Sequence, residues 1–308
     1  MDQQFQQTHS NLSPEVCRAL LAEIEPQSTF MAVRPMGAEG THPAYVITAQ
    51  TAAGAALHLA VKCYHSDDGS TTIRARREFK VLELLQKHAV PVPVPLYLDE
   101  EGALLGTPGI VTTFVNGKQL FALPDVLASA RELARVLAKI HSIPIGPAER
   151  ELLIDANQEM LWFRKAGMMP TYMANHPDGP SVWEAIERLL PTWQAPPSAF
   201  VHTDYWIGQV LWEQGRISAV LDWEEAGYGD PIYDLAYCRM DLWIGPMGCP
   251  AADELLKVYA AEMGRPIANL ALWAFAATPR VMKNAQWEAD CRQGLRDFIA
   301  EVRARVGL

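Results

Sequence analysis

The sequence has few cysteines, and none of them lies at the spacing of a metal or redox site. The five cysteines are scattered along 308 residues and never form a Cys-x-x-Cys pair. A disulfide framework or a zinc site is therefore not expected, because both rely on cysteines in even number or at short regular spacings. We interpret the five as buried free thiols: Cys17, Cys63, Cys238, Cys249 and Cys291.

Long apolar runs are also absent. No run approaches the ~20 residues that are needed to span a bilayer. The first residues, MDQQFQQTHSNLSPEV, lack the basic and apolar regions of a signal peptide. From these two absences we expect a soluble, cytoplasmic protein without a membrane partner.

Basic residues are outnumbered by acidic ones. The 26 Lys and Arg stand against 36 Asp and Glu, which gives a net charge of −10. Nucleic-acid binding needs clustered Lys and Arg, so no nucleic-acid partner is expected. The net negative charge is compatible with a cationic ligand but does not establish one, since a net charge also keeps a protein soluble. A monomer and a homodimer are both compatible with the sequence.

The hydrophobic share of 49% is enough for a large core, and the length suits one large or two modest domains. A helix is expected from Ser13 and Pro14 onward, because serine is a good N-cap and proline suits the first helical position. Residues 28–50 have the pattern of two strands joined by a loop, and AALHLAVKCY alternates apolar residues as a third strand. STTIRARREFKVLELLQKH is expected to be a helix, and VPVPVPLYLDEEG and GIVTTFVNG further strands.

After Gly117 the pattern becomes mostly helical. DVLASARELARVLAKIH has apolar residues at three- and four-residue steps, and the Ser-x-x-Glu that opens SVWEAIERLL has the spacing of a capping box. The last third is expected to be helical, with breaks at Pro266 and Pro279. One β island interrupts the helices, where VLW and ISAVLDW flank a hairpin turn at Gln214-Gly215. The sequence therefore predicts an α+β protein, with a sheet-rich region followed by a helical one.

Two segments set polar residues between apolar runs: HTDYWIGQ and VLDWEEAGYGDPIYDLAY. Here the sequence resembles the aminoglycoside phosphotransferase family, kinase-like enzymes that modify small molecules. The family signature is a His-Gly-Asp loop with an Asn five residues after the Asp, then an Ile-Asp-Trp/Phe strand end and a Gly-Asp-Pro turn. The matching residues are His202, Asp204, Gln209, Asp222, Trp223, Gly229, Asp230, Pro231 and Asp234.

The resemblance implies a fold and an activity. The expected fold is the bilobal one of protein kinases, with a small antiparallel-sheet N-lobe over residues 1–115 that binds the nucleotide. A larger helical C-lobe over residues 116–308 would carry the catalytic loop, the metal site and the acceptor site. The expected activity is transfer of the γ-phosphate of ATP, with Mg²⁺, to a hydroxyl group of a small molecule.

The residue types suit this chemistry. Phosphoryl transfer needs a hydroxyl held in line with the γ-phosphate, a carboxylate to accept its proton, and Mg²⁺ to neutralise the phosphate oxygens. We predict Asp204 as the base and Gln209 and Asp222 as oxygen ligands of magnesium. The hairpin between them would return the chain to one place. Any one of these residues alone could be a turn residue that caps a loop, but the ordered set favours a site.

Nucleotide binding is expected in the first region. Lys62 ends an apolar strand, where an ammonium group is unusual without a task, although a strand-end lysine can also snorkel to solvent. In the family, this lysine grips the α- and β-phosphates and pairs with a helix glutamate. We predict Glu78 as the partner and Glu83 as its rival. Backbone groups of Thr113 and Val115 would face the adenine.

Other polar and small residues have plainer interpretations. The loop PMGAEGTHP contains Gly37 and Gly40 and would cover the phosphates, although a glycine pair in a hairpin is usually just a turn. In the family, acidic residues of the Gly-Asp-Pro region brace the loop, and a histidine at the end of an apolar run is usually a hydrogen-bonded core residue. We interpret four residues in this structural way: His141, His202, Asp230 and Asp234.

Two letters depart from the family signature. Gln209 stands where the family has Asn, with the same amide oxygen on a stem longer by roughly 1.5 Å. Thr203 stands where the family has Gly, so we expect ordinary, negative-φ backbone there. These departures leave an alternative open, a non-catalytic nucleotide-binding kinase-like protein with an impaired metal site.

The acceptor is the least determined part. Between residues 204 and 241, eight acidic residues stand against two arginines, which resembles an acidic cleft for a polycationic aminoglycoside. With the other acids assigned roles, Glu224 and Glu225 remain as candidates to bind an amine, or as solvated side chains. Aromatic and methionine residues near Trp162 would line an apolar acceptor pocket, or else form a helical core stripe. The acceptor stays open among an aminoglycoside, a macrolide, an amino alcohol, a sugar and another metabolite.

Overall fold

The computed structural model describes residues 12–36, 42–65, 69–122 and 124–308. The chain divides into two compact units. The first, which we name the sheet unit, comprises Met1–Lys87 and Val92–Asn116, and the second, the helical unit, comprises His88–Pro91 and Gly117–Leu308. Among the described residues, no helix combines the length and the apolar character that crossing a membrane would take. The expected loop with Gly37 and Gly40 lies outside the described residues.

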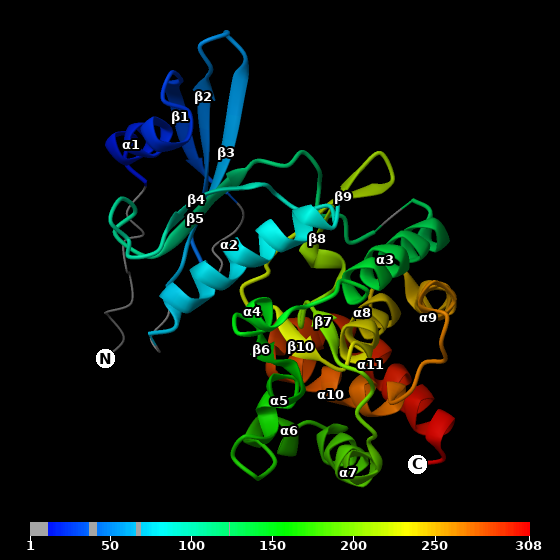
Figure 1. Ribbon diagram of the computed structural model, residues 1–308. Helices are drawn as coiled ribbons and strands as arrows, with labels where there is room; N and C mark the ends of the chain where they lie inside the picture. The colour runs from blue at the N-terminus through cyan, green and yellow to red at the C-terminus, as the bar shows by residue number, and fades with distance from the viewer. Residues whose placement is uncertain (1–11, 37–41, 66–68, 123) are drawn as a thin grey trace. The chain divides into compact units, whose positions relative to one another are not determined.

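The sheet unit is built on a five-stranded antiparallel sheet with the strand order β1-β2-β3-β5-β4 (Figure 1). The third strand shows why these segments are strands, because its alternate residues Leu59 and Val61 are fully buried while their neighbours are not. The strands are β1 (Thr29–Pro35), β2 (Ala44–Gln50), β3 (Ala56–Cys63), β4 (Pro95–Asp99) and β5 (Gly109–Thr113).

Two helices of the sheet unit pack on opposite faces of β3. Helix α1 (Pro14–Ile24), capped by Ser13 as expected, shares a core with Leu59 and Val61. Helix α2 (Thr71–Lys87) instead contacts Lys62, whose side chain points to the other face because strand side chains alternate. The strand and helix predictions for this region are confirmed.

Six helices of 11 residues or more make up most of the described part of the helical unit and pack on one another. Helix α3 contacts α9, α8 contacts α9, α10 and α11, and α7 contacts α10 (Figure 1). The helices are α3 (Val126–His141), α4 (Pro147–Arg150), α5 (Ala156–Glu159), α6 (Thr171–Ala174), α7 (Gly179–Leu189), α8 (Ile232–Ile244), α9 (Gly248–Met263), α10 (Leu270–Lys283) and α11 (Ala285–Val306), with 3₁₀ turns η1 (Trp162–Arg164), η2 (Leu190–Thr192) and η3 (Ile207–Gln209).

The β island of the helical unit carries the polar motif. Strands β6 (Ile154–Asp155), β10 (Gly227–Gly229) and β7 (Ala199–Val201) form one small sheet in that order, and β8 (Val210–Glu213) pairs with β9 (Arg216–Val220) in a hairpin. The expected hairpin turn is present, since Gln214 and Gly215 have φ of 50° and 77°. Two successive positive φ values are typical of the type I′ turn, whose twist matches that of the strands.

Two local predictions in the helical unit were wrong. Pro279 does not end a helix but lies inside α10. A proline leaves the carbonyl four residues earlier without its N–H partner, and here the Thr278 hydroxyl donates to that carbonyl of Phe275 at 2.9 Å. The break expected at Pro266 is present, because α9 ends at Met263 and α10 begins at Leu270.

The capping box was the second error. Helix α7 begins at Gly179, ahead of the predicted start at Ser181, and the Ser181 hydroxyl donates to the carbonyl of Asp178 instead of capping an amide. Glycine is needed at this start because a Cβ on Gly179 would lie 1.9 Å from the carbonyl oxygen of Met173. The cysteine interpretation needs one correction too: all five are free thiols, but Cys249 is exposed and Cys291 only half-buried.

Candidate active site

The polar loop after β7 is fixed by one buried carboxylate, Asp234 on the first turn of α8. Its two oxygens accept the backbone N–H groups of His202 at 2.7 Å and Thr203 at 2.8 Å. Asp234 Oδ2 also lies 3.2 Å from His141 Nε2, and both side chains are fully buried. The ring of His202 contacts the Leu221 carbonyl at 2.8 Å. The structural interpretation of these residues is therefore confirmed.

Asp230 braces the next turn in the same way. It accepts hydrogen bonds from the indole N–H groups of Trp273 at 2.7 Å and Trp193 at 3.1 Å, and from the N–H of Ile232 at 3.0 Å. Because three elements donate to one carboxylate, the Gly-Asp-Pro turn is tied to α10 and to the segment before β7. This interpretation is confirmed as well.

The expectation for the backbone at Thr203 was wrong. Thr203 has φ of 72°, in the left-handed region where glycine would be unstrained. Such a conformation costs a non-glycine residue on the order of 1–3 kcal/mol and persists where the surroundings over-determine it. Here the N–H donates to Asp234 and the hydroxyl donates to the Glu225 carbonyl at 2.9 Å. Threonine thus keeps the loop shape that glycine would adopt and adds a tether to the segment after β9.

Three of the predicted site residues meet. The Gln209 Nε2 donates to Asp204 Oδ2 at 2.7 Å and to Asp222 Oδ2 at 3.2 Å. The hairpin β8–β9 returns the chain between them, and the Leu221 N–H donates to the Gln209 carbonyl at 2.8 Å. The side chain of Gln209 therefore bridges two carboxylates that lie 18 positions apart in the sequence.

An arginine that the sequence analysis missed completes this group. Arg280 of α10 lies with Nη1 2.8 Å from Asp204 Oδ1, and it donates through Nη2 to the Thr203 carbonyl at 3.1 Å. Its Nε donates to the Tyr233 hydroxyl at 3.0 Å. Burial alone would lower the pKa of Arg280, but Tyr233 and Asp204 raise it above its usual value, so the guanidinium stays charged. The only sequence signal was a lone arginine after a long apolar helix run.

The predicted lysine–glutamate pair lies in the sheet unit. Lys62 Nζ is 2.8 Å from Glu78 Oε2, and the buried Tyr64 hydroxyl donates a short hydrogen bond to the same oxygen. The rival Glu83 pairs with Lys80 instead, at 2.9 Å. A buried carboxylate with two donors is held in one place, and it holds the ammonium group of Lys62 at the end of β3.

The segment predicted to face adenine follows β5. The N–H of Thr113 donates to the Val94 carbonyl at 2.9 Å, and its hydroxyl accepts the Val94 N–H at 3.0 Å. The N–H of Phe114 donates to the His58 carbonyl at 3.1 Å. The backbone N–H of Thr113 is therefore taken, whereas its carbonyl oxygen, which accepts the Thr112 hydroxyl at 3.3 Å, keeps a second lone pair for an adenine edge. Val115 comes two residues later, beyond the end of the strand.

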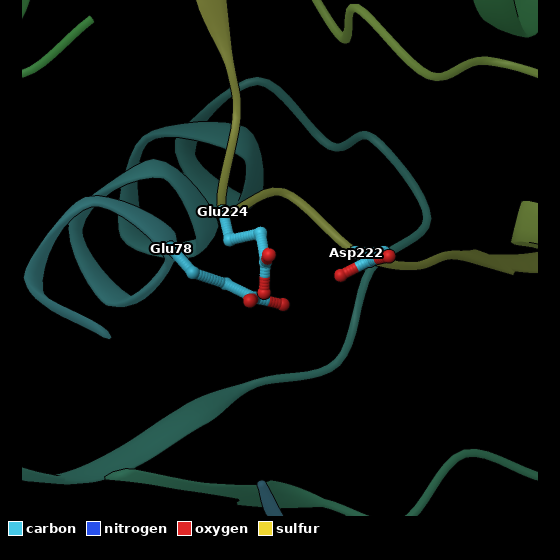
Figure 2. A group of neighbouring side chains, drawn as sticks. All are labelled: Glu78, Asp222 and Glu224. Atoms are coloured by element: carbon cyan, nitrogen blue, oxygen red, sulfur yellow. The ribbon is translucent and has the colours of Figure 1, made fainter. Parts of the chain in front are cut away.

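The candidate acceptor residues have different surroundings. Figure 2 shows Asp222 and Glu224 on the segment after β9, and Glu78 on α2. Glu224 is only 8% exposed, while Glu225 is half-buried and offers its carbonyl to Thr203. Buried Glu224 is therefore not the solvated side chain that we considered.

Trp162 packs against the ring of Tyr172 and against the ammonium group of Lys283. Its ring stacks on Tyr172, with centroids 6.3 Å apart and 17° between planes, and Lys283 Nζ lies 4.7 Å from its centroid. Burial raises the pKa of Tyr172 to about 12, and its hydroxyl has no hydrogen-bond partner among the described residues. Phe163 is buried against Trp183, so that residue belongs to the core stripe that we weighed as the alternative.

The residues present fit a magnesium ion and a nucleotide. Mg²⁺ binds carboxylate and amide oxygens, and Asp222 and Gln209 offer one of each within a hydrogen-bonded group. Gln209 now turns its amide nitrogen to both carboxylates, so it would present its oxygen after a 180° turn of the amide, a choice set by hydrogen bonding. Lys62, held by Glu78, suits an anionic phosphate tail.

Comparison with solved structures establishes the fold. A crystal structure from Ralstonia eutropha, assigned as an aminoglycoside phosphotransferase, superimposes with a TM-score of 0.69 at 18% identity, over 95% of this chain and 98% of that chain. The macrolide 2′-phosphotransferase of Brachybacterium faecium gives 0.62 at 20% identity, over 94% of this chain and 97% of that chain. These likenesses confirm the α+β, protein-kinase-like fold of a sheet region followed by a helical one.

Comparison at the level of sequence establishes the family. The model of the phosphotransferase enzyme family matches residues 35–273, so this chain belongs to that family. Mouse acyl-CoA dehydrogenase family member 10 is 25% identical over 221 residues, which are 62% of this chain and 20% of that protein. The chain spans between about a fifth and a third of the length of the first curated relatives that it matches.

Proposed function

We propose that this chain is an ATP-dependent phosphotransferase that moves the γ-phosphate to a hydroxyl group of a small molecule. The observation that carries the proposal is the hydrogen-bonded group of Asp204, Gln209 and Asp222, with Asp204 held also by Arg280. Two carboxylates and an amide, brought together from the loop after β7 and the segment after β9 at the positions of the family signature, supply a base and two hard oxygen ligands. Membership of the phosphotransferase enzyme family supports the same reaction class.

In this proposal Asp204 accepts the proton of the acceptor hydroxyl. A carboxylate oxygen has two lone pairs. Arg280 takes one on Oδ1 and Gln209 takes one on Oδ2, so each oxygen keeps one lone pair for a substrate hydroxyl. The two donors also fix the plane of the carboxylate before substrate binds. Such pre-orientation is the main way in which a protein assists phosphoryl transfer.

Gln209 and Asp222 would hold Mg²⁺, and Lys62, Glu78, Thr113 and Val115 would bind ATP. Bound Mg²⁺ and ATP supply the transferable phosphoryl group and neutralise its charge. Lys62 binds the phosphates, and Glu78 keeps its ammonium group in place. The Thr113 carbonyl and the Val115 N–H are the backbone groups for the adenine edge.

The acceptor side favours an apolar or weakly charged molecule. Lys283 and Arg280 lie three positions apart on α10 and so on neighbouring parts of one face, and Arg280 contacts Asp204 while Lys283 contacts Trp162. Arg280 beside the proposed base and Lys283 on the Trp162 ring add positive charge to this part of α10, which opposes a polycationic aminoglycoside by charge repulsion. The stacked Trp162 and Tyr172 suit an apolar surface instead. Among the classes considered, a macrolide or an apolar metabolite with a hydroxyl group fits better than an aminoglycoside.

Glu224 and Glu225 are the candidates for an amine of the acceptor. An amino alcohol would need one carboxylate beside Asp204, and the half-buried Glu225 follows the motif on the segment that Thr203 tethers. Replacement of Glu225 by Gln tests this contact, since it should raise the KM for an amine acceptor and leave a neutral acceptor unaffected.

The alternative of nucleotide binding without turnover depends on how the Gln209 amide is turned. The Gln209 amide nitrogen, rather than its oxygen, faces both carboxylates. If this arrangement persists with nucleotide, the amide is not a metal ligand. Thermal-shift titration separates the two functions, because the phosphotransferase should be stabilised more by ATP with Mg²⁺ than by ATP alone. A shift indifferent to magnesium supports the alternative.

The decisive experiment measures ADP release with Mg²⁺ and a panel of macrolides, aminoglycosides, amino alcohols and hydroxylated metabolites. Asp204→Asn should lower turnover by about 10²–10⁴-fold, the usual contribution of a positioned base, while the thermal shift with ATP and Mg²⁺ stays. Asp297→Asn, an exposed carboxylate on α11 that accepts from Gln293, is the matched control and should keep the full rate. Undiminished turnover in Asp204→Asn would refute the role of this carboxylate.

A further inference from the structure

The helical unit contains a pocket whose lining includes none of the residues of the polar loop. It has a volume of about 310 Å³ and lies among η2, the first turns of α10 and the last turns of α11, with Arg239 of α8 also on its wall. Its walls are mostly apolar, with Leu189, Trp193, Ala271 and Val302 among them. None of the described residues that line it carries a carboxylate, whereas two carry guanidinium groups, Arg239 and Arg305.

Arg239 is the unusual member of this wall. It is completely buried, and its guanidinium carbon lies 5.1 Å from the ring centroids of both Trp243 and Phe298. Its Nη2 forms an ion pair with Glu301 Oε2 at 2.8 Å that lacks hydrogen-bond geometry, and within the described part of the chain none of its three guanidinium nitrogens has a hydrogen-bond acceptor. Buried charged donors without acceptors are rare, and each calls for an explanation such as an ion or ligand.

Among the described residues, the carboxylates near the pocket leave N–H donors of Arg239 without an acceptor. Glu301 also pairs with Arg305, one helical turn further along α11, and Arg305 Nη2 lies 3.5 Å from Asp253. Glu301 is thus shared between two arginines and cannot satisfy all the donors of either. An additional negative group would find donors in a wall that is otherwise apolar, where hydrogen bonds to a charged group are strong.

We propose that this pocket binds a small monocarboxylate with an apolar body. The volume equals that of about ten water molecules in the liquid, so it takes roughly ten non-hydrogen atoms. The apolar lining buries the body of the ligand, and Arg239 receives the carboxylate. A dianionic phosphate is disfavoured, because two negative charges cost more to bring into an apolar pocket than one. The ligand site is independent of phosphoryl transfer.

The site also has a structural connection to the Gly-Asp-Pro turn. Trp193 and Asn269 line the pocket, and both donate to Asp230 Oδ2, at 3.1 and 3.2 Å. A ligand in the pocket therefore contacts two of the side chains that brace the start of α8.

Calorimetric titration of the full chain with octanoate, which has ten non-hydrogen atoms, tests the proposal. Octanoate should bind at one site, and 1-octanol, with the same tail and no charge, should bind at least tenfold more weakly, as expected for loss of a charged hydrogen bond. Ala271→Phe fills the pocket from α10 and should weaken octanoate binding at least tenfold. Ala261→Phe, an exposed position on α9 outside the pocket, should change nothing.

Arg239→Met provides the second variant. If it folds, it should bind octanoate and octanol alike, because the apolar wall remains and the charged donor is gone. If it fails to fold, the Ala271→Phe variant and the comparison of octanoate with 1-octanol still test the proposal. Absence of octanoate binding to the unmodified chain, equal binding of octanol, or full octanoate binding in Ala271→Phe would each overturn the proposal.

Discussion

Asp241 gives a prediction that depends on the surroundings of a buried carboxyl group and not on the proposed reaction. This carboxyl group on α8 is almost completely buried, and its Oδ2 accepts the N–H of Ile207 at 3.3 Å, within the loop that carries Asp204. Burial raises the pKa of Asp241 from 3.8 to about 7; the Ile207 hydrogen bond opposes this rise, and the charge of Asp204 adds to it. The folded state therefore holds a proton that the unfolded chain has already released.

The sign of the pH effect follows from that difference. Because the folded-state pKa is the higher one, the stability that protonated Asp241 provides is fully present below pH 3.8 and is lost as the pH rises through 7. A separation of about three pKa units corresponds to about 4 kcal/mol between pH 4 and pH 8. Asparagine keeps an oxygen for the Ile207 N–H and does not ionise.

We therefore expect Asp241→Asn to gain stability relative to the unmodified protein as the pH rises from 5 to 8, and then to level off. Urea unfolding at pH 5, 6, 7 and 8 measures this, with the difference in the free energy of unfolding taken at each pH. Subtracting the free energy of unfolding of the unmodified protein from that of the variant removes the contribution of titrating groups that both share. Asp297→Asn serves as a control at an exposed carboxylate. A difference that does not change with pH would refute the assignment of a buried, protonated carboxyl group.

Two further predictions concern the loop and the hairpin. Asp234→Ala should lower the free energy of unfolding by at least about 3 kcal/mol, because it leaves the buried N–H groups of His202 and Thr203 without an acceptor. Urea unfolding measures this loss, and a loss of less than about 1 kcal/mol contradicts the bracing role. Gln214→Asn should raise it by roughly 0.5 kcal/mol, since asparagine tolerates positive φ better than glutamine, whereas Gly215→Ala should lower it. A thermal melt that orders these two hairpin variants the other way would contradict the type I′ assignment.

Much of the fold was predictable because local patterns and the final structure agree. The alternation of Leu59 and Val61 marks β3, Ser13 with Pro14 marks the start of α1, and Gln214-Gly215 marks the hairpin. The ion pair of Lys62 with Glu78 was also predictable, since the glutamate lies on the same helix face as the apolar residues that pack on the sheet. For the strand, the helix start and the hairpin, the physical cause lies within a few residues of the pattern, whereas the ion pair joins a strand to the helix that follows it.

The rest depended on contacts that local sequence does not contain. Thr203 adopts positive φ because Asp234 and the Glu225 carbonyl bind it, and both come from later segments. Pro279 stays inside α10 because its neighbour Thr278 replaces the missing N–H. Arg280 reaches Asp204 across 76 residues of sequence. No spacing rule links these positions, so only the folded chain reveals them.

The contact between Arg280 and Asp204 has a consequence for how such proteins diverge. The family-wide stretch ends at residue 273, so the arginine that neutralises the motif aspartate lies seven positions outside it. A substitution at this single position of α10 would therefore change the charge beside Asp204 while every residue of the shared signature stays unchanged. Two chains with identical motifs need not accept the same molecules.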